Sequence, residues 1–117
     1  MTHLLFVCAR NRLRSPTAER VFAVVPGIET DSAGLAPDAE CPVTSEHLAW
    51  ADVIFVMEPP HRAKLTRGFG KHLRGKRVVC LDIPDDYEYM APALIEVLWE
   101  RVARVLPQVA GDRPNPP

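Results

Sequence analysis

The chain has 117 residues, a length that a single compact domain fills. It is 47% hydrophobic and 25% charged, values that exclude a disordered or fibrous chain. The formal net charge of -1 argues against a protein that binds nucleic acid or a membrane surface through its overall charge. No apolar run reaches the roughly 18–20 residues that a membrane helix needs. Three widely spaced cysteines predict a cytoplasmic location and no disulfide framework.

Apolar strands alternate with helices along the chain. Continuous apolar runs and one weaker, more polar run predict strands over residues 4–7, 28–33, 52–57 and 78–81. Between and after them, helices are predicted over residues 15–25, 44–50, 59–65 and 91–106. Ser15 is the expected N-cap of the first helix, with Pro16 at its first helical position.

This alternation predicts one α/β domain over residues 1–110, with a four-stranded, mainly parallel sheet and helices on both faces. A polar, proline-rich tail, residues 111–117, is expected to follow it. In such sheets ligands bind outside the carboxyl ends of the strands. The loops at 8–14 and 82–89 both follow apolar strands, so we expect them to meet at that edge.

The loop from Cys8 to Arg14 has the composition of an anion site that contains a nucleophile. A polar loop that leads into a helix N-terminus can turn its backbone N–H groups toward an anion. The positive end of the helix dipole also favours a thiolate there. Arg14 supplies a planar fork for phosphoryl oxygens, and Ser15 can donate to the thiolate. Asn11 can tie the loop to itself through its side chain. A lone cysteine at a strand end is most often a small buried hydrophobe, but this setting favours a reactive one.

Residues 7–19 resemble the V-C-x-G-N-x-C-R-S-P-x-A-E motif of the low-molecular-weight protein tyrosine phosphatases. Residues 31–34 (D-S-A-G), 52–57 (D-V-I-F-V-M) and 83–87 (I-P-D-D-Y) resemble three further segments of that family, in the same order. The fold that this resemblance implies, a parallel four-stranded sheet flanked by helices, agrees with the predicted elements.

The resemblance implies a role for each site residue. Cys8 would be the nucleophile, Arg14 the phosphate clamp, and Ser15 the group that stabilises the thiolate. Asp85 would protonate the leaving oxygen and then activate water. Tyr87 would form an aromatic wall of the cleft. The loop itself would bind substrate, through Ala9, Arg10, Asn11, Arg12 and Leu13.

The chain departs from the family motif at several positions. Arg10 replaces a glycine, so a backbone conformation that needs glycine would be strained or different there. Leu13 replaces a cysteine, which removes a protective disulfide with Cys8. The segment between residues 34 and 52 is shortened, which removes much of the wall around a phenol ring. Arg10 and Arg12 either face the ligand, which would favour anionic substrates, or lie in solvent.

Other acidic and histidine side chains are expected near this edge. Asp86 replaces the proline that follows the family's acid, so either Asp85 or Asp86 could be the general acid, and Asp82 could be a structural cap. His61 is expected to have a surface or helix N-terminal role, beside Glu58. The scattered histidines and cysteines give no metal-ligand spacing, so no metal and no other cofactor are expected.

The predicted function is a cysteine-dependent phosphatase that acts on a phosphorylated protein or a small anionic phosphoester. One alternative is hydrolysis of a nucleotide-derived or cyclic phosphoester; another is a phosphoryl carrier or phosphate-binding regulator that does not hydrolyse. Arsenate reduction is disfavoured, because Cys41 and Cys80 are far apart in the sequence. No membrane or nucleic-acid partner is expected, beyond a nucleotide-type substrate.

Overall fold

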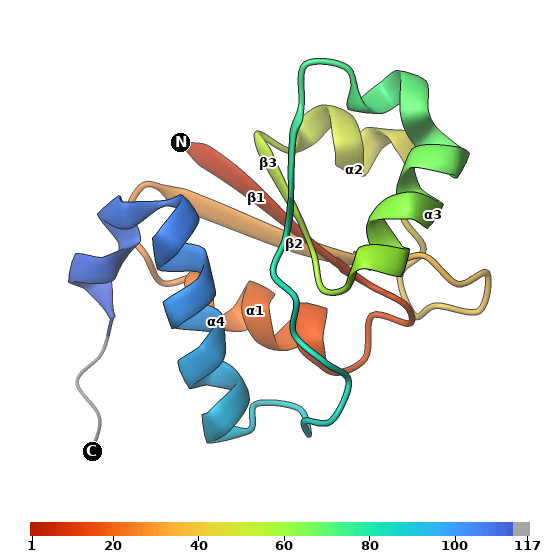
Figure 1. Cartoon of the computed structure of the whole chain (residues 1–117). Helices are drawn as coiled ribbons and strands as arrows, with labels where there is room; N and C mark the ends of the chain where they lie inside the picture. The colour runs from red at the N-terminus through yellow and green to blue at the C-terminus, as the bar shows by residue number, and fades with distance from the viewer. Residues whose placement is uncertain (114–117) are drawn as a thin grey trace.

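Four parallel strands form one sheet at the centre of the computed structural model, which describes residues 1–113 (Figure 1). The strands are β1 (Thr2–Cys8), β2 (Ile28–Gly34), β3 (Val53–Val56) and β4 (Arg77–Cys80). They lie in the order β2-β1-β3-β4, and each neighbouring pair is parallel. The predicted α/β class and four-stranded sheet are confirmed.

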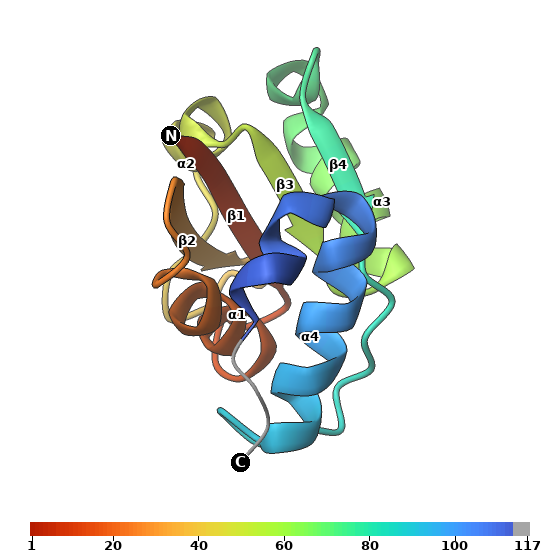
Figure 2. The same ribbon diagram turned by 90° about the vertical axis from the view of Figure 1, so that its left-hand side faces the viewer.

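Helices cover both faces of this sheet, because side chains along a strand alternate between the two faces. In β1, Leu4 and Phe6 pack with α1 (Arg14–Phe22) and α4 (Pro92–Val105). Leu5 and Val7, on the other face, pack against the smaller cluster that includes residues of α2 (Ser45–Trp50) and α3 (Pro59–Phe69). Figure 2 shows α1 and α4 together on one side of the strands, with α2 and α3 beyond the other.

The first helix begins one residue earlier than the sequence predicts. Ser15 is the second residue of α1 and not its N-cap; Leu13 holds that position and makes no side-chain cap. The Leu13 carbonyl accepts the backbone N–H of Thr17 at 3.1 Å and its hydroxyl at 2.6 Å. Thr17 therefore supplies the local hydrogen bonds that start the helix. The Ser15 hydroxyl is buried and has no hydrogen-bond partner within residues 1–113.

Other helix ends also differ from the prediction. The first helix ends at Phe22 and not at residue 25. The third helix extends to Phe69 and continues into a 3-10 helix, η1 (Gly70–Leu73), so Gly68 does not end it. A second 3-10 helix, η2 (Pro107–Asp112), follows α4 and buries Val109 completely. Ordered structure therefore reaches past residue 110 into the predicted tail, whose last four residues, 114–117, lie outside the described residues.

The strand order changes direction between β1 and β3, the two central strands. One connection leads from β1 outward to β2, and the other leads from β3 outward to β4. The loops that follow β1 and β3 therefore separate at the carboxyl edge of the sheet and leave a crevice there, which is where such sheets bind ligands. Within residues 1–113, no helix combines the length and apolarity needed to cross a membrane.

Candidate active site

The loop from Cys8 to Arg14 turns its carbonyl groups away from the crevice. The carbonyls of Cys8, Ala9 and Arg10 accept hydrogen bonds of 3.0, 2.8 and 3.2 Å from the backbone N–H groups of Leu35, Ala36 and Glu40. In the described part of the chain, no backbone N–H of residues 9–13 donates to a protein acceptor. The N–H groups of the first turn of α1 are free by their position in the helix. The loop thus presents unpaired donors, which suit an anion.

Asn11 carries the unusual backbone conformation of this loop. Its φ of 57° lies in the left-handed region, which asparagine tolerates better than most residues. Arg10, which replaces the glycine of the family motif, is outside that region, so the expected strain at Arg10 is absent. Among residues 1–113, the buried Asn11 Oδ1 has no hydrogen-bond partner, so this oxygen does not make the predicted tie.

Gly34, at the end of β2, lets the loop approach the sheet closely. A Cβ atom at this position would lie 2.5 Å from the Ala39 Cβ, 2.9 Å from the Ala9 carbonyl oxygen and 3.0 Å from the Arg10 carbonyl carbon. Two of these three atoms belong to the backbone and cannot move aside alone. The loop conformation therefore depends on a glycine in the neighbouring strand.

The loop encloses a pocket of about 240 Å³ at the carboxyl edge of the sheet. Cys8, which is buried, lines this pocket together with Arg14 and Asp85. The other lining residues are Ala9, Arg10, Arg12 and Leu13. Three predicted site residues, Asn11, Ser15 and Tyr87, do not line it.

Arg14 connects three loops at the pocket, although it is almost fully buried. Its Nη1 donates to the Glu58 carboxylate at 2.6 Å and to the Ile83 carbonyl at 2.7 Å. Its Nε lies 3.6 Å from Asp85 Oδ1. These two hydrogen bonds from Nη1 fix the plane of the guanidinium. The other terminal nitrogen, Nη2, makes no hydrogen bond within residues 1–113, so it can bind a ligand.

The segment after β4 places one of the two candidate acids at the pocket. Asp85 and Asp86 are both exposed, but Asp85 lines the pocket and Asp86 does not. Tyr87 is half-buried and packs against the hydrophobic core, so it forms no wall of this pocket. Asp82, the expected cap, is exposed and has a left-handed φ of 56°.

Hydrogen bonds anchor this segment at both ends. Ile83 N–H donates to the Met57 carbonyl at 2.8 Å, next to β3. Met90 N–H donates to the Thr17 hydroxyl at 3.0 Å, in α1. The segment that carries Asp85 is therefore attached to both elements that hold the pocket.

Arg10 and Arg12 line the pocket, and both are paired with acids of the segment between β2 and α2. Arg10 Nη1 lies 2.8 Å from Asp38 Oδ2, and Arg12 Nε lies 3.6 Å from Glu40 Oε1. Each pair is more than half exposed and so contributes little to stability. The carboxylates offset the surplus of positive charge that the sequence suggests for this loop.

Glu58 and His61 belong to the site, a contact that the sequence analysis did not predict. Glu58 precedes α3 and binds Arg14, while its own backbone N–H donates to His61 Nδ1 at 3.2 Å. Burial and then the nearby Arg14 lower the pKa of His61. Glu58 lies two residues after the end of β3, at the carboxyl edge of the sheet. The rule that pointed to the other two loops could therefore have found it.

No protein-family model and no curated protein matches the chain. Among solved structures, the YwlE arginine phosphatase from Geobacillus stearothermophilus is 20% identical, with a TM-score of 0.70 and full coverage of both chains. The low molecular weight protein tyrosine phosphatase SP-PTP from Streptococcus pyogenes is 16% identical, with a TM-score of 0.73 over 90% of this chain and 93% of the other.

The tyrosine phosphatase Wzb from Escherichia coli K30, in complex with phosphate, is similar over 92% of this chain and 97% of its own, with 22% identity and a TM-score of 0.71. At these identities the likeness concerns the arrangement of the backbone. It confirms the resemblance that the motifs predicted, at the level of the fold. The chain has the fold of the low-molecular-weight protein tyrosine phosphatases.

Proposed function

We propose that the protein hydrolyses a phosphomonoester through a covalent phosphocysteine intermediate. One observation carries this proposal: Cys8, Arg14 and Asp85 line a single pocket, at a loop whose backbone N–H groups have no protein acceptor. A nucleophile, a phosphoryl clamp and a carboxylic acid around one anion site are the groups that this chemistry needs.

In the first step, the Cys8 thiolate attacks phosphorus and the bond to the leaving oxygen breaks. Protonated Asp85 gives its proton to that oxygen, which leaves as an alcohol or phenol. The free Nη2 of Arg14 and the backbone N–H groups of the loop bind the equatorial oxygens, on which negative charge spreads in the transition state. The Ser15 hydroxyl, which has no protein partner, is available to stabilise the thiolate.

In the second step, a water molecule attacks phosphorus and the bond to Cys8 sulfur breaks. Asp85, now ionised, accepts a proton from that water, so one residue serves as acid and then as base. Phosphate leaves, and Cys8 returns to the thiolate. A phosphoryl carrier would not need a carboxylic acid at the pocket, and the position of Asp85 therefore favours hydrolysis over carriage.

For the substrate we propose a phosphotyrosine-type ester on a protein, in the cytoplasm. Two of the similar structures are tyrosine phosphatases, and a third is an arginine phosphatase. The pairing of Arg10 with Asp38 and of Arg12 with Glu40 removes the main argument for a nucleotide-derived substrate.

Acid quenching during turnover of an aryl phosphate, followed by peptide mass spectrometry, tests the proposal. We expect one added phosphoryl group on the peptide that contains Cys8. The Asp85→Asn variant should retain this adduct, and the Cys8→Ser variant should hydrolyse no substrate. Turnover without any adduct on Cys8, or with undiminished rate in Cys8→Ser, would contradict the mechanism.

A further inference from the structure

The charges of this nearly neutral chain are strongly segregated. Seven of its fourteen Lys and Arg residues lie between residues 59 and 81, a stretch with no Asp or Glu. The remainder of the chain carries the other seven and all fifteen acids. The stretch comprises α3, η1, the following turn and β4, so the charge is concentrated at one end of the molecule.

Within residues 1–113, five of these seven cationic side chains have no polar partner. Arg62 and Lys76 are used within the fold, since Arg62 donates to the Val78 carbonyl and Lys76 to the carbonyls of Ala49 and Ala51. The other five are exposed and, within residues 1–113, lie in no hydrogen bond and no ion pair. Four of them, on α3, η1 and the turn that follows, we call the basic end: Lys64, Arg67, Lys71 and Arg74. Arg77 is not included, because it alternates with Val78 along β4 and so shares the α4 face of the sheet with Val79.

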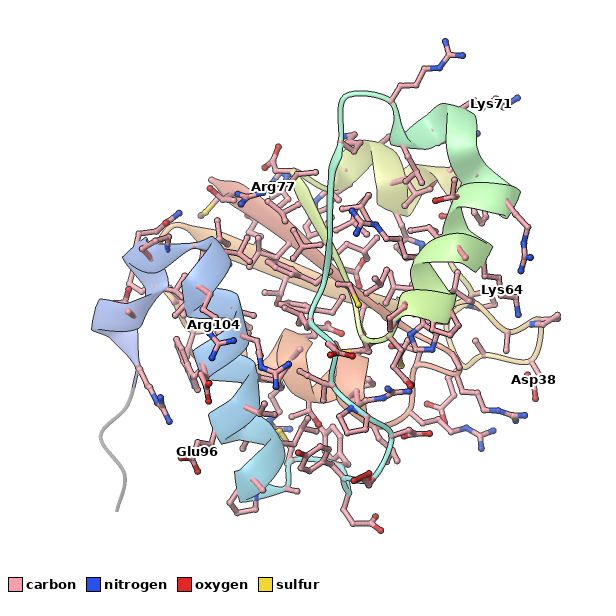
Figure 3. All side chains as sticks on the ribbon, viewed as in Figure 1. Asp38, Lys64, Lys71, Arg77, Glu96 and Arg104 are labelled. Carbon is pink, nitrogen blue, oxygen red and sulfur yellow. The ribbon has the colours of Figure 1, made fainter. Side chains whose placement is uncertain are left out.

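The basic end starts close to the pocket and extends away from it. The residue before α3, Glu58, binds Arg14 in the pocket, and Lys64 lies in the second turn of the same helix. Arg67 follows three residues later on the helix, and Lys71 one further turn on, in η1. Figure 3 shows Lys64 and Lys71 extending outward from this end of the molecule, away from the sheet.

We propose that the basic end is a docking surface for an acidic segment of the phosphoprotein substrate, near the phosphorylated residue. This inference rests on the proposed function. At about 1.5 Å per helical residue, Lys64 lies about 9 Å and Lys71 about 20 Å from Glu58 along the axis of the helix. An extended peptide covers about 3.3 Å per residue, so acidic residues about three to six positions from the phosphorylated one would reach these cations.

Other polyanions fit this surface less well. Stable membrane binding adds an apolar or lipid anchor to a basic patch, and surfaces that bind single-stranded nucleic acid add aromatic rings on which bases stack. The large exposed apolar side chains of residues 1–113 are Met1, Val24 and Tyr89, and all three lie outside 59–81. A continuous nucleic-acid backbone that crossed to the pocket would also meet the carboxylates of Asp38, Glu40 and Asp85.

The test uses the triple variant R67Q/K71Q/R74Q, with R20Q/R104Q/R113Q as a control that loses the same charge from exposed positions elsewhere. Substrates are an aryl phosphate and two phosphotyrosyl peptides, with glutamates or glutamines three to six residues from the phosphotyrosine. We expect the first variant to raise KM for the glutamate peptide about three- to thirtyfold at low salt. Its kcat/KM on the aryl phosphate and on the glutamine peptide should match the wild type and the control.

Binding of labelled, unphosphorylated glutamate peptide, followed by fluorescence anisotropy, separates this inference from the proposed function. Salt-sensitive binding that R67Q/K71Q/R74Q weakens supports docking even if no phosphoester is hydrolysed. Equal binding and equal KM in both triple variants would overturn docking even if the phosphatase activity is present. Tighter binding of an oligonucleotide, or of vesicles that contain anionic phospholipid, would overturn the assignment to an acidic polypeptide.

Discussion

Asp85 is the acidic residue whose surroundings suit a proton donor in the pocket. Its side chain is 61% exposed, and its Oδ1 lies 3.6 Å from the Nε of the buried Arg14. It can therefore approach a leaving oxygen while Arg14 holds the phosphoryl group. Asp86 is adjacent in sequence but does not line the pocket. The difference between neighbouring carboxylates can be tested by matched substitutions.

We expect Asp85→Asn to lower kcat for an aryl phosphate with a poor leaving group by roughly 10²–10⁴-fold, because the leaving oxygen then has no proton donor. Asp86→Asn is the control and should change kcat much less. Steady-state kinetics with leaving groups of graded basicity provide the measurement. A larger loss in Asp86→Asn would show that Asp86 is the acid.

His61 should make the stability of the protein depend on pH. Burial and then Arg14 lower the pKa of His61 below its usual 6.5, so the unfolded chain binds this proton more readily than the folded one. The stability that neutral His61 contributes is complete above about 6.5 and is lost as the pH falls below that value. Its neutral Nδ1 also accepts the Glu58 N–H, a contact that a proton on Nδ1 would break.

The His61→Asn variant keeps a hydrogen-bond acceptor at this position but does not titrate. We expect its stability to fall less than that of the wild type between pH 7.5 and 5.5, in urea unfolding followed by circular dichroism. A His47→Asn variant is a suitable control, because His47 has the same capping position in α2 but lies away from Arg14. Identical pH dependence in wild type and His61→Asn would contradict this role.

At the scale of single residues, the sequence predicted that Cys8, Arg14 and Asp85 meet at one pocket, but it did not predict their other contacts, and their chemical roles stay predictions. Cys8, Arg14 and Asp85 were found because reactive side chains followed the ends of apolar strands. The pairing of Arg10 with Asp38 could not be found, because it depends on how the segment between β2 and α2 folds over the loop. Propensity rules describe neighbours along the chain and carry no information on such contacts.

Among the elements, the end of β2 controls the loop that holds the nucleophile. Gly34 lies against the backbone of Ala9 and Arg10, so a side chain at this position must displace the loop. We expect Gly34→Ala to destabilise the fold by about 1–3 kcal/mol. Its kcat/KM should fall as well, because the backbone N–H groups of the loop would move away from the phosphoryl oxygens.

Gly68→Ala provides the matched control for this prediction. Gly68 lies inside α3, and a Cβ atom there would meet nothing within 4 Å. Alanine has the higher helix propensity, so this variant should be stabilised by up to about 1 kcal/mol with unchanged kcat/KM. Urea unfolding of both variants gives the comparison. A Gly34→Ala protein as stable and active as the wild type would show that the loop can shift without loss.

The same elements show what could be predicted of the fold. Apolar runs identified β1, β3 and β4 to within two residues at each end, because a parallel strand buried on both faces is mostly apolar. The more polar run over residues 28–33 identified β2 to within one residue. The helix ends were less accurate. Gly68 and Ser15 have strong local preferences for breaking or capping a helix, but packing of Leu65 and the hydrogen bonds of Thr17 decide the observed boundaries.

Across the whole molecule, the two faces of the sheet differ in how firmly their helices are held. On one face, α4 buries Leu94, Leu98, Trp99 and Val102, and Trp99 packs against Phe22 of α1 with ring centroids 4.6 Å apart. On the other face, α2 and α3 each bury a single side chain, Leu48 and Leu65. Elements with few buried apolar contacts open locally at a lower free energy than the rest of a protein.

We therefore expect amide hydrogens of α3 to exchange faster than those of β1 and α4 in the native state. Leu65→Ala should speed exchange in α3 further and lower kcat/KM, because Glu58 at the start of α3 holds Arg14 in place. Leu98→Ala should instead lower the global free energy of unfolding by about 2–5 kcal/mol. Native-state hydrogen exchange measured by mass spectrometry separates the two effects. If Leu65→Ala accelerated exchange equally in α3, β1 and α4, the two faces would unfold as one unit, and α3 could not loosen the phosphate clamp independently of the core.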